Sequence, residues 1–180
     1  MKTFKIIIAA IIIAGFASSA MADTPTTDNE TISASAVILT EMSVENAEDI
    51  NFGSILADAA NPLTPNLNPV TGAATGGAGS FGSDTSIGKF VITTGGQANV
   101  KFSWVSSDLD GPGPDLGFAP TVSFGLTDGD NGGSVIANDD VEEIDASGIG
   151  YIWVGGTIDV AAGQAPGSYT GDFTLTAEYN

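Results

Sequence analysis

The last stretch of the chain alternates apolar and polar residues without interruption. Because successive side chains of a strand point to opposite faces, this pattern predicts a terminal β-strand with one dry and one wet face. A preceding stretch, residues 163–167, contains Gly163, Pro166 and Gly167 and predicts a turn. The residues of the dry face are Tyr169, Gly171, Phe173, Leu175, Ala177 and Tyr179.

Shorter stretches of β-branched, aromatic and alternating residues recur upstream, separated by glycine-rich turns. Residues 139–147 are the one candidate for a helical turn, and no segment has a sustained 3.6-residue period. Many short strands with glycine-rich turns predict an all-β fold of two packed, mainly antiparallel sheets. The strands are expected at residues 32–44, 50–53, 90–93, 98–105, 120–126, 134–137, 151–154 and 157–160.

One long segment, residues 57–83, has little periodicity. It contains five glycines and three prolines, which interrupt both helices and strands. Because no apolar face repeats there, we expect a long surface loop.

The first 22 residues have the organisation of a signal peptide. Two lysines, Lys2 and Lys5, precede the apolar run 6–17, and Ala20-Met21-Ala22 supplies a small-x-small cleavage signal. A membrane anchor is the alternative, although a span needs about 20 apolar residues. We therefore expect export to the periplasm, cell surface or medium, with no span left after cleavage. The remaining chain divides into a polar segment, 23–31, and one β-sandwich domain, 32–180.

The chain is strongly acidic. Its formal net charge is −18, and beyond residue 22 its 22 acidic residues face only two lysines, Lys89 and Lys101, which gives −20. Such a field disfavours nucleic acid and anionic membranes as partners. The sequence has no arginine, histidine or cysteine, so His- or Cys-based catalysis is excluded, as is a zinc site of Cys or His ligands. We expect a protein that is not an enzyme and has no disulfide.

Two acidic loops are the candidates for a metal site. Carboxylate and amide oxygens are the ligands that Ca²⁺ prefers, but neither loop has the spacing of a helix–loop–helix calcium site. Asp-Gly and Asn-Gly are also common turn residues, and we favour that interpretation. No cofactor is expected, with calcium as the alternative. The candidate ligands are Asp108, Asp110 and Asp115 in one loop and Asp128, Asp130 and Asn131 in the other.

Both ends of the domain resemble the bacterial "domain of unknown function 4402" family of exported proteins. The resemblance implies an exported, immunoglobulin-like β-sandwich of unestablished activity. The residues that carry it are Ile50–Ile55, Gly156-Thr157-Ile158, Ala165-Pro166-Gly167, Tyr169, Gly171 and Phe173–Tyr179.

The C-terminus also resembles subunits of chaperone–usher pili and spore coat protein U-like proteins. Tyr179 is penultimate and Gly167 is fourteenth from the end, as in those proteins, but there is no cysteine pair and residues 23–31 are polar. The resemblance implies strand exchange with identical subunits or a periplasmic chaperone. Either residues 32–42 are the donated strand, or the protein completes its own fold. The implied pairing residues are Ile32, Ala34, Ala36, Ile38, Gly167, Tyr169, Phe173, Leu175, Ala177 and Tyr179.

The sequence thus leads to two functional hypotheses. The first is an exported, non-enzymatic structural protein of the cell surface or medium, a pilus-like or coat-like subunit that pairs through its strands. The second is a secreted β-sandwich module that binds calcium or glycans.

Overall fold

The computed structural model describes residues 30, 32–36, 38, 40–76 and 84–180. It divides into two units, residues 1–36 and residues 37–180, and the second contains every strand. The described residues form no helix, so none of them contributes a helix able to cross a membrane. The expected signal peptide, residues 1–22, lies outside the described part.

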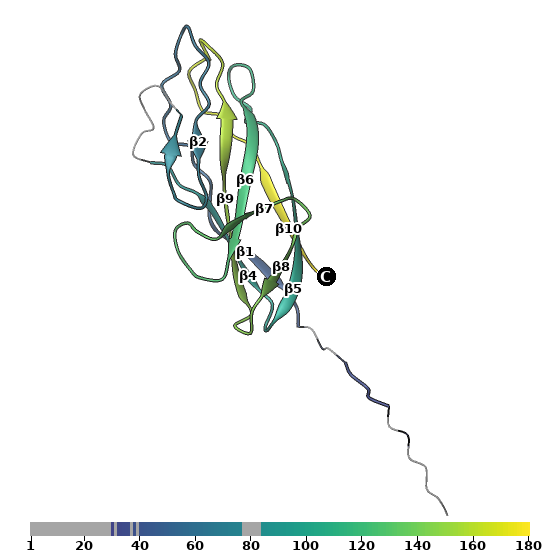
Figure 1. Ribbon diagram of the computed structural model, residues 1–180. Helices are drawn as coiled ribbons and strands as arrows, with labels where there is room; N and C mark the ends of the chain where they lie inside the picture. Colours follow the sequence, from purple (N-terminus) through teal and green to yellow (C-terminus); the bar gives the residue numbers. More distant parts are fainter. Residues whose placement is uncertain (1–29, 31, 37, 39, 77–83) are drawn as a thin grey trace, which may run out of the picture. The chain divides into compact units, whose positions relative to one another are not determined.

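The fold is an immunoglobulin-like β-sandwich of two antiparallel sheets (Figure 1). Strand β9 is the centre of the larger, seven-stranded sheet. It pairs with β6 along one edge, and with β4 and β2 along the other. Strands β1, β3 and β7 then extend the sheet from β4, β2 and β6. The seven strands are β1 (Ser43–Glu48), β2 (Asn66–Leu67), β3 (Ala74–Thr75), β4 (Gly88–Thr93), β6 (Gly117–Gly125), β7 (Ser134–Ile136) and β9 (Ile149–Asp159).

The second sheet has three strands, in the order β10-β5-β8. Its central strand β5 (Ala98–Ser106) pairs with β8 (Val141–Ile144) and along its other edge with β10 (Phe173–Tyr179). Thr174, Thr176 and Glu178 of β10 are exposed, and the residues between them are half-buried. The predicted two-faced terminal strand is therefore confirmed from Phe173 onward.

Two hydrophobic clusters hold the sheets together. The first lies between β5 and the larger sheet, where Phe102 packs on Phe124 with ring centroids 5.6 Å apart. The second lies at the other end of β9, around Phe52, Leu67 and Ile158. Burial of these side chains is the main stabilising contribution of the fold.

The predicted strand at residues 32–44 is wrong over most of its length, because β1 begins at Ser43. Strand β4, the partner of β1, ends at Thr93, opposite Ser43, and the chain turns just after it, at Gly95. The described residues before Ser43 therefore have no ladder to join. They are not part of any strand.

Three other sequence predictions also need correction. Residues 139–147 contain strand β8 rather than a helical turn. The two strands predicted at 151–154 and 157–160 are one strand, β9, which runs through Gly155 and Gly156. The predicted strand at 50–53 is reduced to an isolated bridge between Asn51 and Ser86.

The segment 57–83 is not simply a surface loop. It contains β2 and β3, and its Leu67, Pro65 and Pro69 are fully buried. Strand β2 approaches β9 so closely that a Cβ on Gly155 would lie 2.2 Å from the carbonyl oxygen of Leu67. Gly155 makes room for this contact, Gly156 makes room for the carbonyl of Ala119 in β6, and neither glycine breaks the strand. Residues 77–83 lie outside the described part.

Candidate strand-binding cleft

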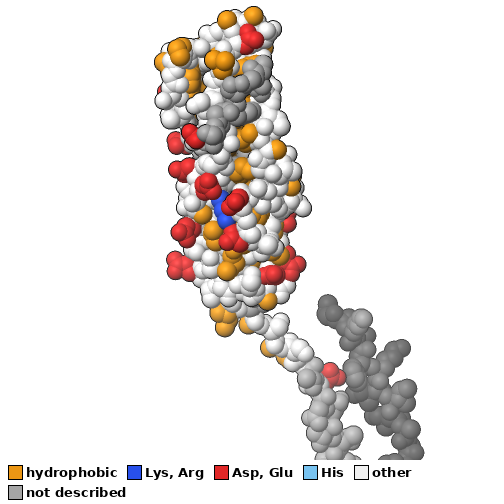
Figure 2. Space-filling view, turned by 90° about the vertical axis from the view of Figure 1, so that its left-hand side faces the viewer, with side chains coloured by type: hydrophobic (Ala, Val, Ile, Leu, Met, Phe, Trp, Pro, Cys, Tyr) orange, Lys and Arg blue, Asp and Glu red, His pale blue; other side chains and the backbone are white. Residues whose placement is uncertain are grey.

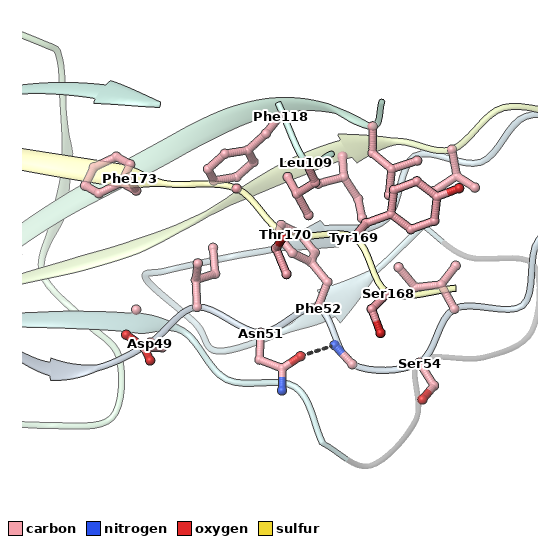
Figure 3. A pocket seen from close by; sticks show the side chains of 18 of the residues that line it. Asp49, Asn51, Phe52, Ser54, Leu109, Phe118, Ser168, Tyr169, Thr170 and Phe173 are labelled. Atoms are coloured by element: carbon pink, nitrogen blue, oxygen red, sulfur yellow. Dashed lines mark hydrogen bonds between the residues drawn. The ribbon is translucent and has the colours of Figure 1, made fainter. Parts of the chain in front are cut away.

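A cleft of about 1090 Å³ opens at one edge of the sandwich, between two irregular segments (Figure 3). The first wall is the chain from Asn46 to Ala57, which comprises the end of β1 and the segment after it. The second wall is residues 164–173, which lead into β10. The cleft therefore lies where an edge strand of one sheet faces an edge strand of the other.

The floor of the cleft is apolar and belongs to the sandwich interior. Phe52 packs edge-on against Phe118, with ring centroids 5.9 Å apart. Toward β1 and β10, Phe90 and Phe173 approach with centroids 6.1 Å apart, and both rings are half-buried. Leu109, Leu116, Val154, Ile158 and Val160 complete the floor. An occupant of the cleft would therefore cover the edge of both hydrophobic clusters.

The first wall is fixed by hydrogen bonds of an Asn–Gly bend. The Gly53 amide donates to Asn51 Oδ1 at 2.8 Å, as Figure 3 shows. Gly53 has φ +67°, which a glycine adopts without steric cost. The Ser86 hydroxyl donates to the Asp49 carbonyl at 2.7 Å, so the wall is tied to the chain that enters β4.

The second wall is built around Tyr169. A Cβ on Gly111 would lie 2.4 Å from its ring, so the loop before β6 closes directly over the aromatic face. The Tyr169 hydroxyl donates to the Ala165 carbonyl at 2.9 Å and accepts from Gln164 Nε2, also at 2.9 Å. Gln164 Nε2 also donates to the Pro114 carbonyl, at 2.5 Å. The second wall is therefore a fixed surface.

Strands β1 and β10 continue the opening beyond the cleft. Among the residues that the structure describes, each pairs on one edge only, β1 with β4 and β10 with β5, which leaves the other edge of each strand free. Val44 is 41% exposed although its partner Ile92 is fully buried. Met42 and the inward side chains of β10 are only half-buried. We call this set the seam: Met42, Val44, Phe173, Leu175 and Ala177.

Tyr179 closes the seam at the end away from the cleft. Its hydroxyl donates to the Thr40 carbonyl at 2.8 Å and lies 3.2 Å from the Thr94 carbonyl. The penultimate tyrosine therefore connects the end of β10 to the chain that enters β1.

The predicted pairing residues occupy three different environments. Phe173, Leu175, Ala177 and Tyr179 lie in β10 and are paired with β5. Gly167 and Tyr169 precede the strand and form part of the second cleft wall. Ile32, Ala34, Ala36 and Ile38 lie outside the strands, and Ile32 and Ile38 are 93% and 92% exposed.

Two of the six candidate calcium ligands, Asp108 and Asp128, have carboxylates engaged with other parts of the protein. Asp108 Oδ1 accepts from the Phe118 amide at 3.1 Å, and the backbone of Asp110 bridges Thr170. The ion pair with Lys89 lowers the pKa of Asp128. Asp115, Asp130 and Asn131 are exposed. Within the described residues, no three Asp, Glu, His or Cys side chains gather as a metal site would require. Calcium binding stays a prediction.

Acidic side chains dominate the charge of the domain. Both lysines of the described chain are paired, Lys89 with Asp128 and Lys101 with Asp139. Figure 2 shows acidic side chains spread along one face, with a single basic patch among them. Glu142 differs from the exposed acids: partial burial, and secondarily the charge of Asp140, raise its pKa.

The comparisons with known proteins identify a family for this fold. Residues 42–179 match the family described as "Domain of unknown function (DUF4402)". The chain belongs to this family. The match covers all ten strands and both cleft walls, and it leaves out residues 1–41. No curated protein and no solved structure matches the chain. The resemblance to pilus subunits stays a prediction.

Sequence analysis missed the first cleft wall. The sequence predicts a short strand at residues 50–53 and places Ile50–Ile55 among the residues of the family resemblance, but it does not predict that Ile50 and Phe52 line a cleft. The Asn51-Phe52-Gly53 triplet is the signal that could have revealed it, because Asn followed by a nearby Gly is typical of a bend.

Proposed function

We propose that this protein is an exported, non-enzymatic structural subunit of the cell surface or medium that pairs with other subunits through β-strands. The observation that carries the proposal is the seam. A row of half-buried and exposed apolar side chains lies between two free strand edges, next to a cleft with an apolar floor. An added strand would satisfy the backbone groups of those edges and bury that row.

The other sheet edges support this assignment because they are protected. Strands β3 and β7 have only two and three residues. At β8, Glu142 is the half-buried residue between two exposed ones and places a charge toward the interior. The Asn138 side chain pairs with both the amide and the carbonyl of Trp104, which covers the rest of that edge of β5. Short edges and inward charges prevent unwanted pairing, whereas β1 and β10 have six and seven residues.

The proposed occupant is the stretch 32–38 of another copy, with a periplasmic chaperone strand as the temporary alternative during export. Ile32, Ala34, Ala36 and Ile38 alternate at period two, as a strand with one buried face requires. Ile32 and Ile38 are among the most exposed apolar side chains described. Burying each would contribute roughly 1.5–3 kcal/mol.

The test uses the exported chain recovered from the periplasm or medium. Phe173→Asp with Leu175→Asp places two charges in the seam, and Ile32→Asp with Ile38→Asp does so in the donated stretch. The matched control is Thr174→Asp with Thr176→Asp, on the exposed face of β10. We expect the first two double variants to be monomeric in sedimentation velocity, while the control associates like the parent chain.

A synthetic peptide of residues 31–42 provides an independent measurement. We expect it to bind a chain lacking residues 23–39 and to raise its melting temperature, because a ligand that binds only the folded state stabilises it. If the peptide does not bind, or if the seam variants associate like the parent chain, the strand-pairing function is refuted.

Glycan binding is the second candidate, and the composition of the cleft favours it. Polar side chains of Asp49, Asn51, Ser168 and Thr170 lie on the two walls around Phe52 and Phe118 (Figure 3). A glycan array separates the candidates. Binding that is lost in Asn51→Ala and retained in the seam variant Leu175→Asp would support a glycan module.

A further inference from the structure

Thr40 is held in a compact hydrogen-bonded site at the end of the sandwich, three residues before β1. Its hydroxyl donates to the Thr94 carbonyl at 2.5 Å, and its carbonyl accepts from the Tyr179 hydroxyl at 2.8 Å. A Cβ on Gly95 would lie 2.3 Å from Thr40 Oγ1, and Gly95 has φ +69°. We call Thr40, Thr94, Gly95 and Tyr179 the clasp.

The clasp is anchored to rigid parts of both sheets. Thr94 is 4% exposed and directly follows β4. Its amide donates to the Gly148 carbonyl at 2.8 Å, and its hydroxyl donates to the Gly96 carbonyl at 2.6 Å. Tyr179 is the last residue of β10. The position of Thr40 is therefore fixed by the β4–β5 turn and by the final strand together.

The clasp determines the direction from which the chain enters β1. Strand β1 runs from Ser43, beside the clasp, toward Asn46, where the cleft begins. For residues 32–38 to lie along the seam of their own chain, the backbone would have to reverse between Ile38 and Ser43. Two-residue hairpin turns need Gly, Asn or Asp, and the sequence there, Ile-Leu-Thr-Glu-Met-Ser, has none of them. A reversal would therefore need a longer loop that includes Thr40, which the clasp holds in place. Ile38, two residues before Thr40, is 92% exposed.

We propose that the clasp prevents self-completion, so that residues 32–38 are available to the seam of a second copy. This inference rests on the strand-pairing function proposed above. Tyr179 and Thr40 are positioning residues in it: they hold the backbone just after the end of the donated stretch and do not touch the incoming strand.

The test compares three ways of opening the clasp. Tyr179→Phe removes only the hydroxyl, Thr40→Val removes the other donor with little change in volume, and insertion of Asn-Gly between Glu41 and Met42 supplies the missing turn. The control is Tyr151→Phe, because the Tyr151 ring lies on the larger sheet, stacked on Trp153. We expect the dissociation constant for association between copies to be at least about tenfold larger in each clasp variant. A factor of ten is the change that loss of one hydrogen bond to a fixed group can produce.

A second readout distinguishes this role from a merely structural one. Self-completed monomers should protect residues 32–38 from hydrogen exchange at low protein concentration and should melt at a higher temperature than the parent monomer. If the clasp variants instead melt lower and associate like the parent, the clasp only stabilises the fold and the inference is overturned.

The experiment separates this inference from the proposed function. If the peptide of residues 31–42 binds and the clasp variants associate like the parent, strand pairing stands and the clasp inference fails. If the peptide does not bind any form of the chain, the strand-pairing function itself fails.

Discussion

In Glu142, partial burial outweighs any stabilising contact and raises the pKa of the carboxyl group, and this sets a pH-dependent penalty on stability. Its pKa is raised in the folded chain, first by burial and then by Asp140. Above that pKa, the carboxylate is less favourable folded than unfolded, so the penalty is fully present at pH 7. It disappears as the pH falls below the unfolded value of about 4.3.

We therefore expect Glu142→Gln to melt higher than the parent at pH 7 and at the same temperature at pH 3.5. Because the side chain is largely solvated, the rise should be small, about 1 °C. Differential scanning calorimetry of the monomer at the two pH values measures it. Glu143→Gln, at the neighbouring exposed position, is the control. An equal rise in melting temperature in both variants would indicate instead that removing any one negative charge relieves the general repulsion among the acidic side chains.

Gly111 lies directly against Tyr169 of the second cleft wall. A Cβ at this position would lie within 2.4–2.7 Å of three atoms of the Tyr169 ring. Gly111→Ala should therefore displace the ring and lower stability by about 1–3 kcal/mol. Gly96→Ala is the matched control, because a Cβ there would meet nothing within 4 Å. Urea unfolding of both variants tests this, and equal midpoints would show that the loop moves freely over Tyr169.

At the scale of the strand, the inward residues of β10 and β5 alternate in the same way but are buried to different degrees. Phe102 of β5 is fully buried, whereas Leu175 of β10 is half-buried. In the monomer, Phe102→Ala should cost about 3–5 kcal/mol, while Leu175→Ala should cost less than the 2–5 kcal/mol typical of a buried leucine.

If a strand from another copy covers the seam, the cost of Leu175→Ala should rise on association, and that of Phe102→Ala should not. Urea unfolding at protein concentrations below and above the dissociation constant measures both costs. An unchanged cost for Leu175→Ala would mean that the associated form leaves the seam open.

The sequence allowed prediction of the strands that have a repeating local pattern. Strands β5, β6 and β10 follow from alternation, and β4 and β7 from short apolar runs bounded by turns. The prediction of strands was wrong where a residue is required by a neighbour that is distant in sequence. Gly155 permits the close approach of Leu67, and a two-residue strand such as β2 has no period to detect. The cleft could not be predicted because its walls, residues 46–57 and 164–173, meet only in the folded chain.

At the scale of the whole molecule, charge opposes association between copies. Beyond residue 22 the chain has 22 acidic residues and two lysines, and both lysines are already paired with aspartates. Acids also lie beside the proposed pairing surfaces, with Glu45, Glu48 and Asp49 along β1 and the first wall, and Glu178 on β10. Two copies that approach through these surfaces repel each other over distances comparable to the Debye length.

We therefore expect association to strengthen with salt, the reverse of an interface based on ion pairs. Raising NaCl from about 0.01 M to 0.5 M shortens the Debye length from about 30 Å to about 4 Å, and the dissociation constant should fall at least about tenfold. Sedimentation equilibrium measures the change.

MgCl₂ at matched ionic strength separates screening from cation binding. Equal dissociation constants in the two salts indicate screening, and a much smaller dissociation constant in Mg²⁺ would indicate ions held between copies. Weaker association in salt would mean that the two partners meet through complementary charges. The described surface of this chain cannot supply them, because both of its lysines are already paired with aspartates. The proposed interface between identical copies would then be wrong.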